Sequence, residues 1–395
     1  MNKIITYTSV ALALLLTACG SSSDESTQSA PLTSGQLIDN YVENIDYHCQ
    51  DGKIAVTDKN GSFNCTTLPV RFQLGELKLG EIDLIPADGQ VFPQDLVGVS
   101  RDDINNSRVK AMAQFLQSLD ADSNPDNGIR IESHVKERFT IQTEFNEDDL
   151  ENYITQANKR RVDENSSTEH LELSTEFVEA VDAANIPSSV KEALLTPANE
   201  LTQEVKDTIA YMGNEERLAY DVYQYLYNYH LNNGVAINQL TNISTRSETK
   251  HIQTVELLVK KYITSLDDFS NLDATRNLDA DMSYSDLSAD EMPAGKYNIQ
   301  HIQDLYDELT AKGVESKEAA LEAGCIVEVV DVEDLDDEIA LARESNATDI
   351  VTAFEFLREG SYKHYWSFDK GLKNMGLSGC CVAGDAYCHP EYPQN

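Results

Sequence analysis

The sequence predicts an α+β multidomain protein in which a C-terminal all-α four-helix bundle follows a small β-rich module. Two observations support this. Short strand-like segments with turn signals between them extend to about residue 100 of a module that covers residues 41–145 and includes one helix. In residues 201–376, apolar residues recur at helical spacing over long stretches. An acidic, helix-prone linker of residues 146–200 joins the two parts, and a cysteine-rich tail of residues 377–395 ends the chain.

The first 18 residues have the features of a bacterial export signal. Lys3 precedes the apolar run VALALLL, which is too short to span a bilayer, and small residues follow it. The segment LTAC resembles a lipobox, so we predict cleavage before Cys19 and lipidation of that residue; an ordinary signal cut near Ala18 is the alternative. Residues 19–40 are then a polar tether. Because Gly20 follows the cysteine, we expect sorting to the outer membrane of a Gram-negative cell envelope.

The chain is strongly acidic, with 30 Lys and Arg against 68 Asp and Glu and a formal net charge of −38. Such a surface repels nucleic acid and anionic lipid head groups. We therefore expect no nucleic-acid partner. We also expect that the N-terminal lipid, and not the protein surface, attaches the chain to a membrane.

One loop of the β-rich module has the spacing of a calcium site. After a predicted helix, the segment DADSNPDNG alternates oxygen-bearing side chains as calcium loops do: Asp120, Asp122, Asn124 and Asp126. Pro125 stands where the EF-hand pattern requires glycine, so a polar turn closed by Asn127 and Gly128 is the alternative.

Six cysteines remain besides Cys19, and disulfides are the default in an exported chain. Cys49 and Cys65 bracket a predicted hairpin with an Asn-Gly turn, so we expect a bridge between them. Two further bridges can form among Cys325 and the tail cysteines Cys380, Cys381 and Cys388. A zinc site made by the three tail cysteines and His389 is the alternative.

The C-terminal region contains four predicted long helices. They cover about 203–231, 244–263, 316–343 and 347–373, and a shorter helix covers about 298–312. A long acidic connector separates the second long helix from the short one. Four long helices with one long crossover are typical of bundles of the ferritin type. The tyrosines of the first helix, Tyr220, Tyr223, Tyr227 and Tyr229, are expected to pack at its surface, with electron transfer to a metal as the alternative.

Each long helix also carries a carboxylate or an imidazole near its apolar stripe. These residues are Glu216 on the first helix, Glu248 and His251 on the second, Glu328 and Asp331 on the third, and His364 on the fourth. One such residue is weak evidence, because a single Glu is usually solvated and a single His is usually satisfied in a core. Several carboxylates in an apolar core repel one another, and a divalent cation removes that cost. Oxygen and imidazole ligands together suit iron or manganese.

The region from about residue 215 to 376 resembles the ferritin-like family called domain of unknown function 2202. The segments EERLAYDVYQYLY, SETKHIQTVELLVKKY, IQDLYDEL, SKEAALEAGCIVEVVDVEDL and LREGSYKHYWSF carry the resemblance. The family is similar in pattern to rubrerythrin-like di-iron carboxylate bundles. That similarity implies that Glu216 and Glu328 are single carboxylate ligands, that Glu248 bridges two metals, and that His251 and His364 bind one metal each.

One departure from the di-iron pattern affects the second metal position. Ser361 stands three residues before His364, where a bridging Glu would be expected, and Asp331 is the reserve ligand. The resemblance implies a di-iron oxidoreductase of the ferroxidase or peroxidase type, with iron or another divalent metal such as manganese. The alternative is a non-catalytic structural or binding lipoprotein that uses the bundle as a scaffold. The sequence identifies neither an electron donor nor an oligomeric state.

Overall fold

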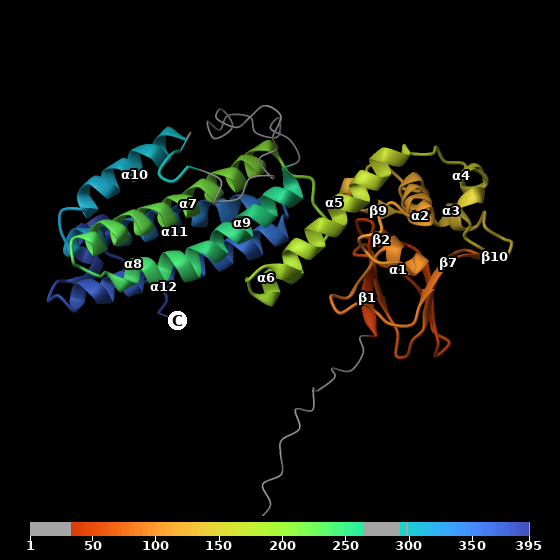
Figure 1. Cartoon of the computed structure of the whole chain (residues 1–395), viewed down its shortest axis with the longest axis horizontal. Helices are drawn as coiled ribbons and strands as arrows, with labels where there is room; N and C mark the ends of the chain where they lie inside the picture. The colour runs from red at the N-terminus through yellow and green to blue at the C-terminus, as the bar shows by residue number, and fades with distance from the viewer. Residues whose placement is uncertain (1–32, 264–292, 298, 395) are drawn as a thin grey trace, which may run out of the picture. The chain divides into compact units, whose positions relative to one another are not determined.

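The structure, a computed structural model, describes residues 33–263, 293–297 and 299–394 (Figure 1). The predicted signal peptide, Cys19, most of the tether and most of the acidic connector lie outside these residues. In the described part, strands occur only before residue 145, and the C-terminal part is helical. The predicted α+β class, with a β-rich module before a helical region, is therefore confirmed.

The strands of the module form three sheets. Their bounds are β1 Ser34–Leu37, β2 Val42–Glu43, β3 Asp46–Cys49, β4 Ile54–Val56, β5 Ser62–Asn64, β6 Val70–Leu74, β7 Leu77–Ile82, β8 Gln90–Val91, β9 Ile129–Arg130 and β10 Thr143–Glu144. The largest sheet has the order β10-β7-β6-β3-β4, the second has the order β5-β1-β8, and β2 pairs with β9. β1 lies within the segment that the sequence predicts to be tether, because Leu37 is fully buried in the module core.

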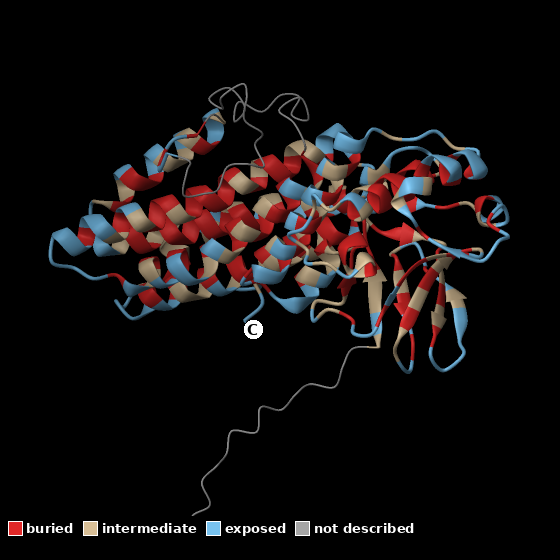
Figure 2. Cartoon of the chain, turned by 45° about the vertical axis from the view of Figure 1, so that its right-hand side comes forward, coloured by how far each residue is buried: buried red, intermediate tan, exposed pale blue. Residues whose placement is uncertain are grey.

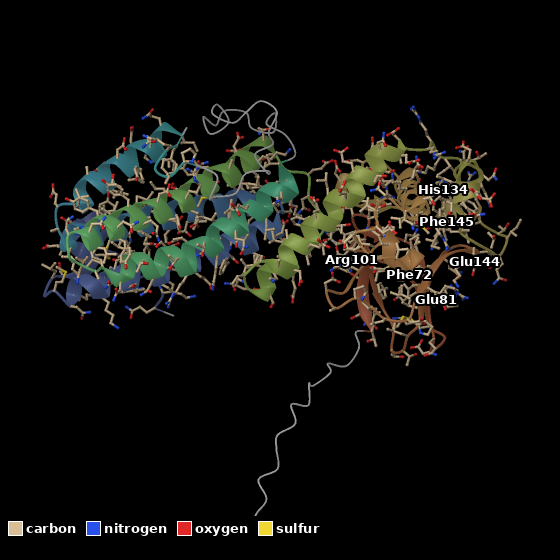
Figure 3. The ribbon with its side chains drawn as sticks, viewed as in Figure 1. Phe72, Glu81, Arg101, His134, Glu144 and Phe145 are labelled. Carbon is tan, nitrogen blue, oxygen red and sulfur yellow. A yellow bond between two sulfur atoms is a disulfide. The ribbon has the colours of Figure 1, made fainter. Side chains whose placement is uncertain are left out.

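The module core forms between the largest sheet and short helices. These helices are α1 Pro93–Val97, α2 Ser107–Ser118, α3 Ser133–Lys136 and α4 Leu150–Ala157, with short 3₁₀ turns η1 Pro125–Asn127 and η2 Glu147–Asp149. Phe72 packs edge-on against Phe63 with ring centroids 4.9 Å apart. Figure 3 shows Phe72 and Phe145 in the module, with Glu81 and Glu144, each of which lies within 3.6 Å of the Lys78 amine. The predicted Cys49–Cys65 bridge is present.

Residues 146–200 contribute to two cores. Leu150, Tyr153 and Ile154 of α4 belong to the module core. Two further helices follow, α5 Glu164–Ala183 and α6 Ser188–Leu194. Leu194 of α6 packs in the same apolar cluster as Phe354, far along the chain. This segment thus takes part in packing on both sides, which its weak apolar periodicity did not indicate.

The helical region consists of long helices that contact one another in a closed ring. Their bounds are α7 Gln203–Asn232, α8 Asn238–Ile243, α9 Thr249–Tyr262, α10 Gln300–Gly313, α11 Lys317–Glu344 and α12 Thr348–Lys373. α7 contacts α9 and α11, and α12 contacts the same two helices. Figure 2 shows the buried residues gathered on the sides where these helices face one another. The bounds of α7, α10, α11 and α12 agree with the predicted ranges to within two residues.

Helix ends follow from local side-chain chemistry. The Thr202 hydroxyl accepts a hydrogen bond from the backbone N–H of Val205 and caps α7, and Ser316 caps α11 in the same way. Asn346 has a φ of 56° and separates α11 from α12. Because a left-handed residue cannot continue a helix, the chain reverses there and brings α11 and α12 side by side.

The second long helix contains one turn of π-helix, η3, at Ser244–Glu248. It joins α8 to α9, so that the helix begins at Asn238 and not near residue 244 as predicted. A π turn holds one more residue than an α turn and therefore changes which side of the helix the following residues face. Glu248 is its last residue.

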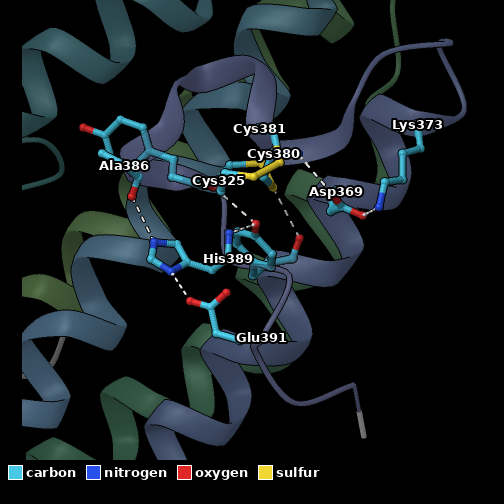
Figure 4. Close-up of a disulfide and its surroundings, with 11 residues drawn as sticks. Cys325, Asp369, Lys373, Cys380, Cys381, Ala386, His389 and Glu391 are labelled. Atoms are coloured by element: carbon cyan, nitrogen blue, oxygen red, sulfur yellow. Dashed lines mark hydrogen bonds and ion pairs between the residues drawn. A yellow bond between two sulfur atoms is a disulfide. The ribbon is translucent and has the colours of Figure 1, made fainter.

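The cysteine-rich tail is tied back to the helical region (Figure 4). It carries the 3₁₀ turns η7 Gly379–Ala383 and η8 Asp385–Tyr387. Cys380 is bonded to Cys325 of α11, and Cys381 is bonded to Cys388. The alternative of a zinc site is therefore wrong, because no tail cysteine keeps a free thiolate. His389 instead contacts Glu391 and the carbonyl oxygen of Ala386. In the part of the chain that the structure describes, no helix is both long and apolar enough to cross a membrane.

Candidate metal centre

Two groups of potential metal ligands lie inside the helical region and share one residue. Glu216, Glu248 and His251 form the first, and Glu248, Glu328 and His364 form the second; in each, ligand atoms lie within 4.8 Å of one another. Glu248 Oε2 is 3.1 Å from His251 Nδ1, and its Oε1 is 3.0 Å from His364 Nδ1. Glu216 Oε2 is 3.0 Å from His251 Nδ1, and Glu328 Oε2 is 3.3 Å from His364 Nδ1. The structure thus brings five of the predicted metal residues together, which we call the metal centre.

The metal centre is a polar layer between two apolar clusters. One cluster contains Leu258, Leu335 and Phe354, and the other contains Leu226 and Phe368. Along each of the four long helices, the residues of the metal centre fall where one cluster gives way to the other. None of the five residues is more than 5% exposed. Three carboxylates and two imidazoles are therefore gathered in a dry interior, which is costly without a compensating charge.

Several of these buried atoms have no hydrogen-bond partner. Glu216 Oε1, Glu248 Oε1 and His364 Nδ1 are all in this state. Glu248 Oε1 and His364 Nδ1 are close, yet their geometry is wrong for a hydrogen bond between them. Buried polar groups are normally satisfied, so such atoms require an explanation. A cation among them would supply the missing partner, and the oxygen and nitrogen donor set fits a first-row divalent metal.

Tyr223, Ser247 and Gly360 keep the ligands of the metal centre in position. The sequence did not predict this role for them. Tyr223 is fully buried and donates a hydrogen bond from its hydroxyl to Glu328, so the prediction that it packs at a surface is wrong. The Ser247 hydroxyl lies 2.6 Å from His364 Nε2 and fixes that ring, as partners of metal-bound histidines do. A Cβ at Gly360 would lie 2.2 Å from His251 Nε2, so only glycine leaves room for this imidazole.

Asp331, the predicted reserve ligand, lies beside the metal centre and is not in either group. Its Oδ2 accepts a hydrogen bond of 2.5 Å from the Ser361 hydroxyl. Ser361, which stands where a bridging Glu was expected, therefore orients the carboxylate that the sequence suggested as its replacement.

Burial and mutual charge determine the protonation of the metal-free centre. Burial alone would raise the pKa of Glu248, but the imidazoles of His364 and His251 hold it well below its usual range. Burial would lower the pKa of His364, but Glu248 and Glu328 raise it to about 10. The pKa of His251 is raised in the same way by Glu216 and Glu248. Burial raises the pKa of Glu216 to about 7, against the opposing charge of His251. Two imidazolium ions therefore balance the carboxylates when no metal is present.

The loop predicted to bind calcium directs its oxygens to its own backbone. Asp120 accepts hydrogen bonds from Asn124 N and Arg130 N, and Asp122 accepts one from Asn124 N. Asp126 lies 3.5 Å from His170 Nε2 of α5. Within the described residues, groups of three acidic or imidazole ligands occur only at the metal centre. Calcium binding by this loop stays a prediction.

Comparison with known proteins shows what the helical region is similar to. Residues 205–381 match the model of the family described as "Uncharacterized protein domain (DUF2202)", which confirms the resemblance stated from the sequence. The chain is 28% identical over 180 residues to the uncharacterised protein MJ0754 of Methanocaldococcus jannaschii, in an alignment that spans 46% of this chain and 81% of that protein. A crystal structure of MJ0754 covers 50% of this chain and 91% of its own, at 26% identity, with a TM-score of 0.37, which is too low to bear on the fold.

Proposed function

We propose that the helical region is a ferritin-like four-helix bundle that holds a pair of divalent metal ions, iron above all. In this proposal the protein oxidises ferrous iron or reduces oxygen or peroxide. The observation that carries it is the pair of ligand groups that share Glu248, with buried oxygens and an imidazole nitrogen that have no hydrogen-bond partner. Glu216 and His251 would hold one ion, Glu328 and His364 the other, and Glu248 would serve both.

A redox-active metal pair, when bound, supplies one-electron transfer between ferrous iron and the oxidant. The protein supplies the surroundings: apolar clusters above and below exclude water, and Tyr223 and Ser247 keep Glu328 and His364 oriented. In the overall reaction, oxygen or peroxide takes up the electrons that ferrous iron loses and, with protons, gives water. The carboxylates favour the ferric product, because they stabilise the higher positive charge.

Metal content tests this function directly. Protein purified without chelators and loaded with ferrous iron should hold about two equivalents, and Glu248→Gln should hold less than about one, because both groups lose a ligand. Glu333→Gln, at an exposed position of α11, is the control and should leave the content unchanged. Ferrous oxidation under air or peroxide should fall at least about tenfold in Glu248→Gln only.

The second candidate is a scaffold without catalysis, favoured by Ser361 in place of a bridging carboxylate. Protein that binds no metal, and whose melting temperature chelator leaves unchanged, would establish the scaffold and overturn the metal function.

We also propose that the chain works in the cell envelope, attached by a lipid on Cys19. The export signal, the lipobox-like LTAC segment and the disulfides support this location. Mass spectrometry of the mature N-terminus, with an unlipidated Cys19→Ala control, tests it.

A further inference from the structure

The β-rich module contains an open cavity that belongs to neither the metal centre nor the helical region. Its volume is about 540 Å³, and residues of β1, β3, β4, β5 and β8 line it together with the turns next to these strands. β1, β5 and β8 form one sheet, while β3 and β4 form one edge of the largest sheet. A cavity of this size is large enough for a small ligand, and the functions proposed above use none of its residues.

Gln90 lines this cavity and has an unsatisfied amide oxygen, although the residue is only 3% exposed. Its Nε2 donates a hydrogen bond of 2.9 Å to Gln36 Oε1, and Gln36 Nε2 donates one of 3.0 Å to the carbonyl oxygen of Asn60. Gln90 Oε1, in contrast, is buried and has no hydrogen-bond partner. Because buried polar atoms are normally satisfied, this oxygen lacks a donor, which a hydroxyl group of a ligand can provide.

Further polar side chains line the same cavity without a protein partner. The Tyr47 hydroxyl, the Ser62 hydroxyl and the Asn64 amide make no hydrogen bond to another described residue. The Tyr47 ring itself is buried and packs edge-on against Phe63 with ring centroids 6.0 Å apart, so the position of its hydroxyl is fixed. Hydroxyl and amide groups both donate and accept hydrogen bonds, and this combination matches a ligand that carries many hydroxyl groups.

The charge of the cavity favours a neutral ligand. Asp58 and Asp88 line it, and its described lining residues include no lysine, arginine or histidine, so an anion is repelled. Asp88 is already paired with Arg101. A metal ion is not favoured either, because the described residues contain no group of three acidic or imidazole ligands here. Val56 of β4, which is 48% exposed, adds an apolar surface for the C–H groups of a sugar ring.

We propose that this cavity binds a neutral saccharide. The Tyr47 hydroxyl, the Asn64 amide and the Ser62 hydroxyl bond to hydroxyl groups of the sugar, and Val56 contacts its apolar face. The β-rich module would thus give the protein a binding function of its own, which depends on neither the metal centre nor its proposed chemistry.

Saturation-transfer difference NMR of the metal-free protein with maltotriose, cellotriose and chitotriose tests the proposal. At least one of these neutral trisaccharides should bind with a dissociation constant of roughly 0.1–10 mM, as expected for a small, wet site. Tyr47→Phe/Asn64→Ala removes a hydroxyl and an amide from the cavity and should weaken this binding at least about tenfold. Tyr153→Phe/Asn152→Ala makes the same chemical changes on α4 of the module, outside the cavity, and should leave the binding unchanged.

Each result either supports or overturns the saccharide site. Binding that the cavity variant loses and the α4 variant keeps supports it. It is overturned if none of the three trisaccharides binds at concentrations up to about 20 mM, or if wild type and cavity variant bind equally well. Trigalacturonate should bind more weakly than the neutral sugars, and tighter binding of this anion would contradict the role of Asp58 and Asp88. Asn64→Ala alone, at an exposed position of β5, should weaken binding in the same direction if the double variant unfolds.

Discussion

Glu248 is the residue on which the geometry of the metal centre depends most. Each of its oxygens faces a different imidazole, so it connects the two ligand groups. As the last residue of the π turn, directly before α9, it extends into the layer that Glu216 and Glu328 enter from other helices. A glutamate one residue earlier or later along the helix would face a different side of it.

Gly360 gives a prediction that needs no change to a ligand. In Gly360→Ala, the new Cβ would lie 2.2 Å from His251 Nε2, so the imidazole must leave the position in which its Nδ1 faces Glu216 and Glu248. We expect metal affinity to fall about 10- to 100-fold, as for other residues that orient a ligand. Titration of metal-free protein with Mn²⁺, followed by electron paramagnetic resonance, measures this.

Gly371→Ala is the matched control on the same helix. Its Cβ would meet the end of the flexible Gln239 side chain, and alanine is the better helix former, so metal affinity should not change. Equal affinities in the two variants would show that His251 is not held by Gly360.

The buried pair of Asp39 and His170 predicts a pH-dependent stability. Asp39 is fully buried, and its Oδ1 lies 3.4 Å from His170 Nδ1. His170→Ala leaves the Asp39 carboxylate without its cation, which should lower the free energy of unfolding by about 3 kcal/mol near pH 6. Urea unfolding measures this, and the double variant Asp39→Asn/His170→Gln, without a buried charge, should recover most of the loss.

The direction in which pH changes the stability follows from the pKa of His170. Burial would lower its pKa, but Asp39 outweighs burial and raises it above 6.5. The stabilisation by the pair is therefore complete below about pH 6.5, as long as Asp39, whose pKa burial raises, is ionised, and it is lost as pH rises through the raised pKa of His170 in the folded protein. The difference between wild type and His170→Ala should shrink at alkaline pH. A constant difference would exclude an ion pair.

For the secondary-structure elements, the sequence predicted the bounds of the long helices well but the side-chain contacts between them poorly. Apolar spacing and the stops at Gly313 and Asn346 set the bounds of α10 and α11 closely. The same periodicity cannot reveal a π turn, which changes the register within a helix without any marker residue. It also cannot show that Tyr223 reaches Glu328, because 105 residues separate them along the chain.

The candidate ligands could be predicted because charged groups interrupt apolar stripes at the same depth of each helix. Gly360 and Ser247 could not, because their role depends on the neighbouring helix: one leaves space, and the other offers a hydroxyl. Similarly, the sequence suggested two bridges among the last four cysteines but left their pairing open, because only the packing of the tail on α11 decides it.

The tail bridges predict unequal contributions to stability. Cys325–Cys380 closes a loop of 55 residues, and Cys381–Cys388 closes one of 7. Because a longer loop restricts the unfolded chain more, Cys325→Ala/Cys380→Ala should lower the free energy of unfolding by roughly 4 kcal/mol, against roughly 2 kcal/mol for Cys381→Ala/Cys388→Ala. Denaturant unfolding under oxidising conditions compares them, and the reverse order would contradict the assignment of the bridges.

For the whole molecule, the excess of acidic residues and the buried centre act together. A net charge of −38 raises the concentration of cations near the surface and favours their capture. Inside, however, two imidazolium ions already balance the carboxylates of the metal centre, as the raised pKa values of His251 and His364 indicate. Metal ions must therefore compete with protons for the same site.

This competition predicts proton release on metal binding. At pH 8 both imidazoles are protonated in the metal-free protein, since the pKa of His364 is about 10 and that of His251 is raised well above its usual value, whereas Glu216, with a pKa of about 7, is mostly ionised. A histidine binds metal only when it is neutral, so filling the centre should release about two protons. The affinity for metal should therefore rise with pH until the pH approaches the pKa of His364. Calorimetric titration with Mn²⁺ in two buffers of different ionisation enthalpy counts the protons. His364→Gln should release about one fewer, and an affinity that does not depend on pH would mean that these imidazoles are not ligands.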